Sequence, residues 1–212
     1  MSQAHDVLWP YADHLSRPLP EVAEDLEAFA ALLFKWNKAQ NLVSRETVGD
    51  LWPRHIADSL QVLPLLKESD VTLLDLGSGG GFPSIPVAIA SKGQRNPILV
   101  EPIGKKASFL KAVNRELGLG MRVESVRAES LDPENCPPVD VVTSRALAPL
   151  TALCSMALPF WRPNTRAIFH KGREHVEELA ESGASYYFDV VVHPSRTDDS
   201  GVLIELSKLR KR

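Results

Sequence analysis

Four glycines within five residues follow a short apolar run in the first half of the chain, and their spacing suits a ligand site. The segment from Val71 to Pro83 reads VTLLDLGSGGGFP. Glycine tolerates positive φ angles and places no Cβ between the main chain and a ligand, while N–H groups at a helix start attract anionic groups. The pattern predicts a strand, a tight turn and a helix start that hold a ribose or phosphate-like group. A connection without a ligand is the less favoured interpretation.

The spacing of these glycines excludes two common nucleotide-binding loops. A dinucleotide-binding turn needs Gly-x-Gly-x-x-Gly, and the third position holds Phe82 or Ser84, depending on the frame. A P-loop would need Gly-Lys followed by Ser or Thr, which this segment lacks. The acidic residue followed by alternating glycines, from Asp75 to Gly81, resembles motif I of S-adenosylmethionine-dependent methyltransferases.

The elements that must position this turn alternate between strands and helices. Apolar patterns and turn residues predict strands at 71–76, 97–101, 121–126, 138–143, 166–170, near 187–192 and near 201–207, and helices at 83–91, 104–117, 148–158 and 173–181. Such alternation favours an α/β fold with a mostly parallel, doubly wound sheet of seven strands. The last two strands have no helix between them, which predicts a C-terminal antiparallel hairpin.

Helices are expected before the sheet. Apolar residues recur at helical spacing at Val22, Leu26, Phe29, Leu33 and Trp36. A second helix is expected over 48–66, begun by Thr47 with Asp50 in a weak variant of the capping box. We therefore expect an N-terminal helical extension over residues 1–68 and a cofactor-binding domain over residues 69–212, which together form one structural unit.

Ligands of such sheets bind outside the carboxyl ends of the strands, so the residues there are candidates for the site. Glu101 lies 20 positions after Gly81, a spacing that lets a carboxylate accept hydrogen bonds from ribose hydroxyls; a solvated carboxylate is the alternative. The segment 127–129 is placed to lie along an adenine ring, although an ordinary polar loop looks the same and is favoured. Arg145, after the strand at 138–143, suits a carboxylate, a phosphate or a structural ion pair.

Seven ordered blocks between Phe34 and Gly172 carry a more specific signal than any one motif. They are KWNKAQNL at 35–42, RHIADSL at 54–60, DLGSGGGFP with Ile85-Pro86 at 75–86, Lys105-Lys106 with Phe109-Leu110, Arg127-Ala128-Glu129, Ser144-Arg145-Ala146, and Lys171-Gly172. Together they resemble the bacterial small-subunit (16S) ribosomal RNA guanine-N7 methyltransferase G family, also called glucose-inhibited division protein B.

The resemblance implies a Rossmann-like class I S-adenosylmethionine-dependent methyltransferase fold, and an enzyme that methylates N7 of a guanine in small-subunit ribosomal RNA. It implies an S-adenosyl-L-methionine pocket lined by Gly77, Gly79, Phe82, Glu101, Ala128, Glu129 and Arg145. One departure is Ser84, where the family usually has glycine; serine costs little in the first turn of a helix. The implied partner is small-subunit ribosomal RNA or the assembled small ribosomal subunit.

The chemistry implied by the resemblance requires positioning more than acid–base catalysis. Guanine N7 carries no proton, so its methylation needs no general base, and the rate would come from orientation. Candidates for positioning the acceptor are Asn41, His55 and Arg145, with Asp58 beside them in sequence; for His55 a packing role in a helix is at least as well supported. Four cations on one predicted helix form either a solvated face or an RNA contact: Lys105, Lys106, Lys111 and Arg115.

Composition limits the partners and the compartment. The formal net charge of −3 excludes nucleic-acid binding by bulk electrostatics, so any RNA-binding surface must be local. Cys136 and Cys154 lack metal-ligand or Cys-x-x-Cys spacing, so we expect no metal and a reducing compartment. No secretory signal opens the chain, and the longest charge-free run, 146–161, is shorter than a membrane span. We expect a cytoplasmic monomer without membrane contact. A frayed, solubilising tail is favoured over a dedicated RNA contact for the basic end at 208–212, although such a tail can add salt-sensitive affinity for phosphates.

Two other classes of protein stay open at this stage. A methyltransferase of small molecules would share the cofactor half and enclose its acceptor under an apolar lid; the polar segments 36–41 and 54–59 argue mildly against it. A non-catalytic nucleotide-binding protein is the third possibility.

Overall fold

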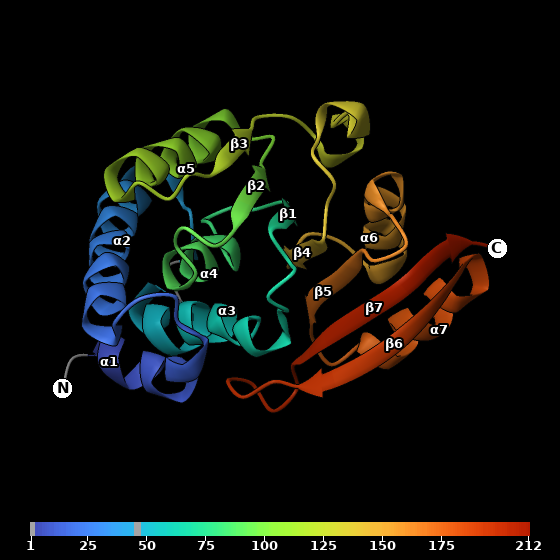
Figure 1. Cartoon of the computed structure of the whole chain (residues 1–212), viewed down its shortest axis with the longest axis horizontal. Helices are drawn as coiled ribbons and strands as arrows, with labels where there is room; N and C mark the ends of the chain where they lie inside the picture. The colour runs from blue at the N-terminus through green and yellow to red at the C-terminus, as the bar shows by residue number, and fades with distance from the viewer. Residues whose placement is uncertain (1–2, 45–47) are drawn as a thin grey trace.

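A seven-stranded sheet forms the centre of the computed structural model, which describes residues 3–44 and 48–212 (Figure 1). The strand order is β3-β2-β1-β4-β5-β7-β6. The strands are β1 (Thr72–Leu76), β2 (Asn96–Val100), β3 (Arg122–Glu124), β4 (Val141–Arg145), β5 (Arg166–Lys171), β6 (Tyr186–Pro194) and β7 (Val202–Lys211). The first five run parallel, and β7 pairs antiparallel with both β5 and β6. The predicted sheet with its C-terminal hairpin is confirmed.

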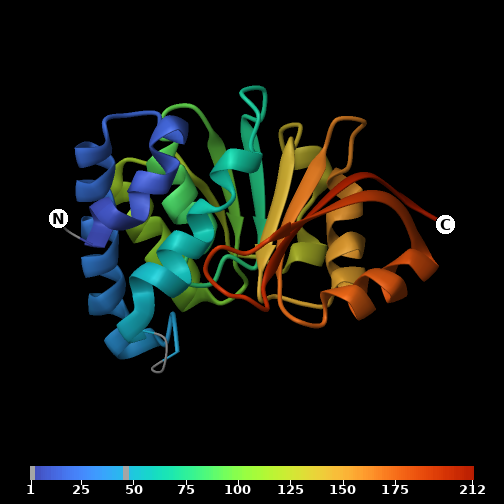
Figure 2. The same cartoon turned by 90° about the horizontal axis from the view of Figure 1, so that it is seen from below.

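Helices cover both faces of the sheet, which separates two apolar cores (Figure 2). The N-terminal helices, α4 (Ser84–Ala90) and α5 (Gly104–Leu117) lie on one face; α6 (Leu150–Ala157) and α7 (His175–Ser185) lie on the other. Side chains alternate between the two faces of a strand. Leu73 of β1 therefore joins the first core, whereas Leu74 and Leu76 join the second.

Strand order reverses between β1 and β4, because the chain runs outward from β1 to β3 and then returns to β4. This switch point is the position where open α/β sheets bind ligands. The segments after β1 and β4 diverge there, and Asp75 and Thr143 are directly paired across the two strands. The glycine turn and Arg145 consequently lie at one edge of the sheet.

Several predicted bounds shift for identifiable reasons. The helix predicted at 104–117 has these same bounds in α5, and Gly118 ends it with φ +58°. β4 begins three residues later than predicted because the Asp140 carboxylate accepts hydrogen bonds from the Val71 and Thr72 N–H groups ahead of the strand. β3 is shorter than predicted because it pairs with β2 over three residues only.

The N-terminal part differs more from prediction. The first predicted helix is confirmed as α2 (Leu19–Gln40), and α1 (Gln3–Leu8) with a 3₁₀ turn at Trp9–His14 was not predicted. The single helix predicted at 48–66 is wrong; the predicted cap at Thr47 lies outside the described residues. The segment consists of short pieces at Val48–Asp50, Trp52–Ala57 (a π-helical turn), α3 (Asp58–Leu60) and Leu63–Leu65.

Prolines explain this interruption. Pro53 and Pro64 each lie in the first turn of a short piece. Proline is tolerated there because its missing N–H group would have no partner, but in the interior of a longer helix it would break the hydrogen-bond pattern. The extension is nevertheless packed tightly, since Leu26, Phe29 and Ile56 are fully buried in the core that they share with Leu73 of β1. Within residues 3–44 and 48–212, no helix has the length and apolar character needed to cross a membrane.

The prediction of a frayed C-terminal tail is also wrong. β7 continues to Lys211, and the Arg212 N–H group donates a hydrogen bond to the Ser185 carbonyl at 3.0 Å. The last residues of the chain are therefore part of the sheet.

Candidate functional site

The glycine turn follows β1 directly and adopts a backbone that other residues avoid. Gly77, Gly79 and Gly81 have φ angles of +72°, +55° and +92°. A Cβ built on Gly77 would lie 2.6 Å from Cδ1 of Leu147, so a side chain there would meet the loop after β4. The N–H groups of Gly77 and Ser78 donate to the Val100 carbonyl at the end of β2. The positive φ disfavours any other residue at position 77, and a Cβ there would also require the end of the Leu147 side chain to shift.

Glu101 fixes this turn from the neighbouring strand end. Its Oε2 accepts a hydrogen bond from the Gly79 N–H group and its Oε1 accepts one from the Ile103 N–H group, both at 2.8 Å. The side chain is 4% exposed, so the alternative of a solvated carboxylate is wrong. Each carboxylate oxygen keeps a second lone pair for a further donor.

Two connected hollows meet at the turn. The glycine-turn hollow, of about 330 Å³, is bordered by Gly77, Gly79, Phe82, Glu101 and Arg145 among others. The apolar hollow, of about 720 Å³, continues past Val100 and Met156 to the loop that holds Ala128 and Glu129. Gly77, Pro102, Ile103 and Leu147 border both hollows. All seven residues predicted to bind the cofactor therefore border one of the two.

Asp75, the acidic residue of the motif, lies buried beneath the turn. Thr143 Oγ1 donates to its Oδ1 at 2.9 Å, and its Oδ2 has no hydrogen-bond partner within the described part of the chain. Burial raises the pKa of this carboxyl to about 6. The glycine cradle, which a Cβ would fill, and the apolar hollow beside it together fit a ligand with one polar end and one flat apolar end.

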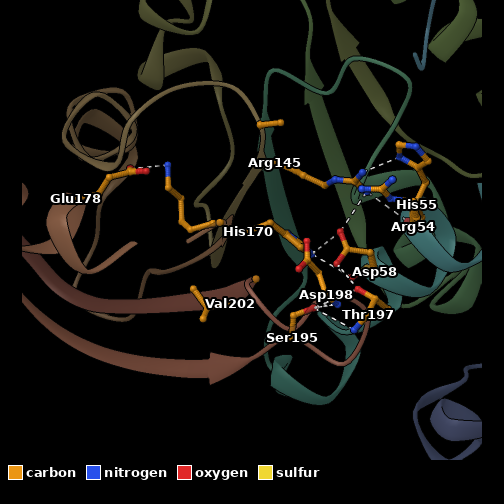
Figure 3. Close-up of a pocket in the computed structure, with 14 residues that line it drawn as sticks. Arg54, His55, Asp58, Arg145, His170, Glu178, Ser195, Thr197, Asp198 and Val202 are labelled. Atoms are coloured by element: carbon orange, nitrogen blue, oxygen red, sulfur yellow. Dashed lines mark hydrogen bonds and ion pairs between the residues drawn. The ribbon is translucent and has the colours of Figure 1, made fainter. Parts of the chain in front are cut away.

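A third space, the polar cavity, adjoins the glycine-turn hollow and measures about 610 Å³ (Figure 3). Its walls come from the segment before α3 and the first residue of α3, from the ends of β4 and β5, from α7, and from the loop between β6 and β7. His55, Arg145 and Ala146 border both spaces. Charged side chains of both signs line it: Arg54, Asp58, Arg145, Lys171, Glu178 and Asp198.

Arg145 stands between the two spaces with its position fixed on three sides. Its Nη2 lies 2.6 Å from Nδ1 of His55, its Nη1 lies 3.3 Å from Oδ2 of Asp58, and its guanidinium carbon lies 5.6 Å from the centroid of the Phe82 ring. A guanidinium group only donates, so Nδ1 of His55 accepts and the ring is neutral. Burial, reinforced by the charge of Arg145, lowers the pKa of His55 to about 4.

The loop between β6 and β7, residues 195–201, is held over the polar cavity by the helical extension. Thr197 Oγ1 donates to Oδ1 of Asp58 at 2.9 Å. Gln61 donates to the Ser195 hydroxyl at 3.2 Å and accepts from the Arg196 N–H group at 2.6 Å. Asp58 thus contacts Arg145 on one side and this hairpin loop on the other.

The end of β5 supplies a buried ion pair to the same cavity. Lys171 Nζ lies 2.5 Å from Glu178 Oε2 and donates to the Ala148 carbonyl at 3.0 Å. His170, the preceding residue, lies 3.1 Å from the Asp58 carbonyl through Nε2. Lys171 therefore connects the loop after β4 with α7.

Some predicted residues lie apart, and some residues that border the site were not predicted. Asn41 ends α2 in the left-handed conformation, is exposed, and borders none of the three spaces. Leu147 and Thr197 border the site without a sequence signal. His170 lies at a strand end, so the strand-end rule could have indicated it.

The described residues include no group of three or more His, Cys, Asp or Glu side chains that could hold a metal ion. Cys136 and Cys154 are free and buried.

The sheet order, the glycine turn and the paired spaces define the class I S-adenosylmethionine-dependent methyltransferases. The Aeropyrum pernix fibrillarin with natively bound S-adenosyl-L-methionine aligns with a TM-score of 0.51 and 15% identity, covering 65% of this chain and 66% of that one. Precorrin-6y C5,15-methyltransferase from Geobacter metallireducens GS-15 aligns with a TM-score of 0.52 and 16% identity, covering 80% and 92%. These similarities confirm the predicted fold class.

Sequence comparison specifies the family. The model of rRNA small subunit methyltransferase G matches residues 22–199. Ribosomal RNA small subunit methyltransferase G of Brucella ovis is 45% identical over 194 residues, covering 91% of this chain and 90% of that protein. The protein of the same name from Rhodospirillum centenum is 45% identical over 192 residues, covering 91% and 87%. This chain belongs to the rRNA small subunit methyltransferase G family. It is a methyltransferase whose cofactor is S-adenosyl-L-methionine, as the sequence predicted.

Proposed function

We propose that this chain transfers a methyl group from S-adenosyl-L-methionine to N7 of a guanine in small-subunit (16S) ribosomal RNA. The observation that carries this proposal is the junction at His55, Arg145 and Ala146, which border both the glycine-turn hollow and the polar cavity. A methyl transferase needs two adjoining spaces, one for the donor and one for the acceptor. When bound, the cofactor supplies a methyl group on a positively charged sulfur, which N7 attacks with its lone pair.

The donor half is assigned to the sheet. Gly77 and Gly79 give a ligand close access to the main chain, Glu101 offers lone pairs to ribose hydroxyls, and the segment at Ala128 and Glu129 borders the apolar hollow that suits a flat ring. Asp75 borders neither hollow; it lies beneath the turn and supports it through its hydrogen bond with Thr143.

The acceptor half is assigned to the polar cavity. Arg145, fixed by His55 and Asp58, presents a planar set of donors where an oxygen of the base or a phosphate would lie. His55 acts through Arg145, because its Nδ1 is already engaged and N7 has no proton to remove. The methylated guanine carries a positive charge, which the carboxylate of Asp198 on the cavity wall would offset, since Glu178 is already paired with Lys171.

The acceptor half draws on both proposed parts of the chain, since Arg145 and the loop between β6 and β7 belong to residues 69–212. Arg54, His55 and Asp58 come from the helical extension over 1–68, and the cofactor residues come from the domain over 69–212. Charged walls favour a polynucleotide acceptor over a small apolar molecule. We expect a monomer that acts in the cytoplasm on RNA or on the assembled small subunit; the free cysteines support a reducing compartment.

The experiment supplies labelled S-adenosyl-L-methionine together with either small subunits or naked 16S RNA from cells that lack this modification. Digestion of the product to nucleosides should yield labelled 7-methylguanosine. Labelled methyl groups in another nucleoside would contradict the proposal, as would transfer only to small molecules. A Gly77→Asp variant serves as the inactive control, since its side chain would meet Leu147 and fill the turn.

A further inference from the structure

The end of β7 carries a bulge that redirects its last residues. Tyr187 of β6 pairs with Arg210, while Asp189 pairs with Ser207, so β7 has one residue more than β6 between these two pairs. Lys208 lies in the bulge with φ +54°, a left-handed conformation that costs free energy for a residue other than glycine. Leu209, the next residue, is buried in the second core. The strained backbone is thus held in place by packing.

Beyond the bulge, two arginines lie against one aromatic ring. The guanidinium carbon of Arg212 lies 4.2 Å, and that of Arg210 lies 4.9 Å, from the centroid of the Tyr187 ring. Tyr187 is 44% exposed and both arginines are exposed. Stacking on a ring orders a guanidinium group and leaves its N–H donors free for an anion. This hairpin platform, made of Tyr187, Arg210 and Arg212, is fixed because Arg212 donates its N–H group to Ser185.

The charge at this end is opposite in sign to that of the whole chain. Four of the last five residues, from Lys208 to Arg212, are cations in a protein of formal charge −3. Asp189 is an acidic residue within the hairpin, and it lies 2.7 Å from Lys208, so Arg210, Lys211 and Arg212 keep a net positive charge. Such a local cationic patch is the footprint of a polyanion.

The platform is far from the acceptor cavity. Ser207 pairs with Arg166 at the start of β5, whereas the cavity lies at Lys171 at the other end of that strand. At about 3.3 Å per residue, β5 alone separates the two by about 17 Å. Figure 2 places the C-terminus at the outer edge of the molecule, beyond α6. A ligand that reaches both must be a macromolecule.

We propose that the hairpin platform binds the phosphodiester backbone of the RNA substrate at a second position, remote from the modified guanine. This inference depends on the proposed function. Phosphate oxygens accept hydrogen bonds from both N–H groups of a guanidinium fork, and the Tyr187 ring orders the two arginines for this contact. The contact increases the affinity for RNA and orients it, but it does not distinguish one base sequence from another. It takes no part in methyl transfer.

The test measures binding of 16S RNA and of small subunits by the wild-type protein and by R210Q/R212Q over a series of salt concentrations. Loss of two phosphate contacts should lower the affinity about 10-fold and reduce the slope of log K against log salt by about 1.4 to 1.8. R210K/R212K, which keeps the charge but not the planar fork, should bind with intermediate affinity. Methyl transfer should show a raised KM for RNA and an unchanged kcat.

A matched control removes two charges elsewhere. K67Q/K92Q neutralises two lysines, Lys67 on the loop before β1 and Lys92 after α4, whose ion pair with Asp25 is shared with Arg17. Equal loss of affinity in this variant would overturn the platform, because the effect would then come from net charge alone. Weaker binding of assembled subunits with unchanged binding of naked RNA would also overturn it, in favour of an acidic protein partner. A wild-type protein that binds no ribosomal RNA would instead contradict the proposed function.

Discussion

Nη2 of Arg145 lies 2.6 Å from Nδ1 of His55, and this contact joins the helical extension to the end of β4. The arginine provides only donors, so the histidine must be the neutral acceptor. Burial and the neighbouring cation keep it so by lowering the pKa of His55 to about 4. The contact lies where the glycine-turn hollow meets the polar cavity, so the protonation of one ring affects both halves of the site.

The first prediction concerns stability at mildly acidic pH. The pKa of His55 is lower in the folded chain than its ordinary value of 6.5, so the unfolded chain binds more protons between about pH 6.5 and about pH 4. The stability that neutral His55 provides above pH 6.5 is therefore lost as the pH falls toward 4. Urea unfolding measures the free energy of unfolding at pH 7.5 and at pH 5. Between these two values it should fall by about 1 kcal/mol more for wild type than for His55→Gln. The exposed His14→Gln variant should follow wild type; the same pH dependence in His55→Gln would refute this account.

Asp75 has a pKa shift with the opposite consequence. Burial raises the pKa of its carboxyl from 3.8 to about 6. Between these pH values the folded chain therefore binds more protons than the unfolded chain, and at pH 7 the charged carboxylate destabilises the folded chain. Asp75→Asn should therefore raise the free energy of unfolding at pH 7.5 by about 1 to 2 kcal/mol, and by less at pH 5. It should also weaken cofactor binding. Thr143→Val, which removes the hydroxyl that donates to Asp75, should destabilise; a destabilised Asp75→Asn would count against the pKa argument.

Local signals explain what the sequence predicted well. The glycine turn, α5 and its end at Gly118, and the buried β1 each depend on residues close together in the chain. The spacing of the glycines and the period of the apolar residues can be recognised without knowing which distant residues they contact. The position of the glycine turn at the end of β1 was therefore accessible to prediction.

Features that depend on distant partners were not accessible. Asp58 and Thr197 are 139 positions apart, and the sequence gives no sign that the hairpin loop returns to the extension. The end of β7 resembles a solvated tail because Leu209 alone among its last residues is apolar, and its strand pairing with β6 is set by tertiary contacts. The break at Pro53 was visible, yet the apolar period around it favoured a continuous helix.

A third prediction separates steric clash from backbone strain at the glycine turn. Gly77→Ala should weaken cofactor binding at least 10-fold, because its Cβ would meet Leu147 and its φ of +72° is strained. Gly93→Ala has a similar φ of +82° and no described atom within 4 Å of the new Cβ, so it should lower stability by about 1 kcal/mol without affecting cofactor affinity. Calorimetric titration with S-adenosyl-L-methionine measures both. Gly77→Ala with Leu147→Ala should recover part of the affinity; no recovery would mean that Leu147 is not the obstacle.

The last prediction concerns the hairpin loop as a wall of the acceptor cavity. Thr197 borders the polar cavity and neither of the other two hollows, and its hydroxyl donates to the carboxylate of Asp58 that also holds Arg145. Thr197→Val removes this hydrogen bond, and those of the same hydroxyl with Gln61 and Ser195, at nearly constant volume, at a cost of about 1 kcal/mol. We expect kcat/KM for RNA to fall about 5-fold to 10-fold, corresponding to that free energy, while the dissociation constant for S-adenosyl-L-methionine stays unchanged.

Ser200→Ala provides the control for this experiment, since Ser200 lies in the same loop and bonds to Asp198 rather than to the extension. It should leave both constants near wild type. An equal fall in cofactor affinity for Thr197→Val would mean that the loop supports the whole site instead of the acceptor side, because Asp58 would then transmit the change through Arg145 to the glycine turn. A selective fall for RNA locates the acceptor in the polar cavity and makes Asp58 the residue that couples the loop to Arg145.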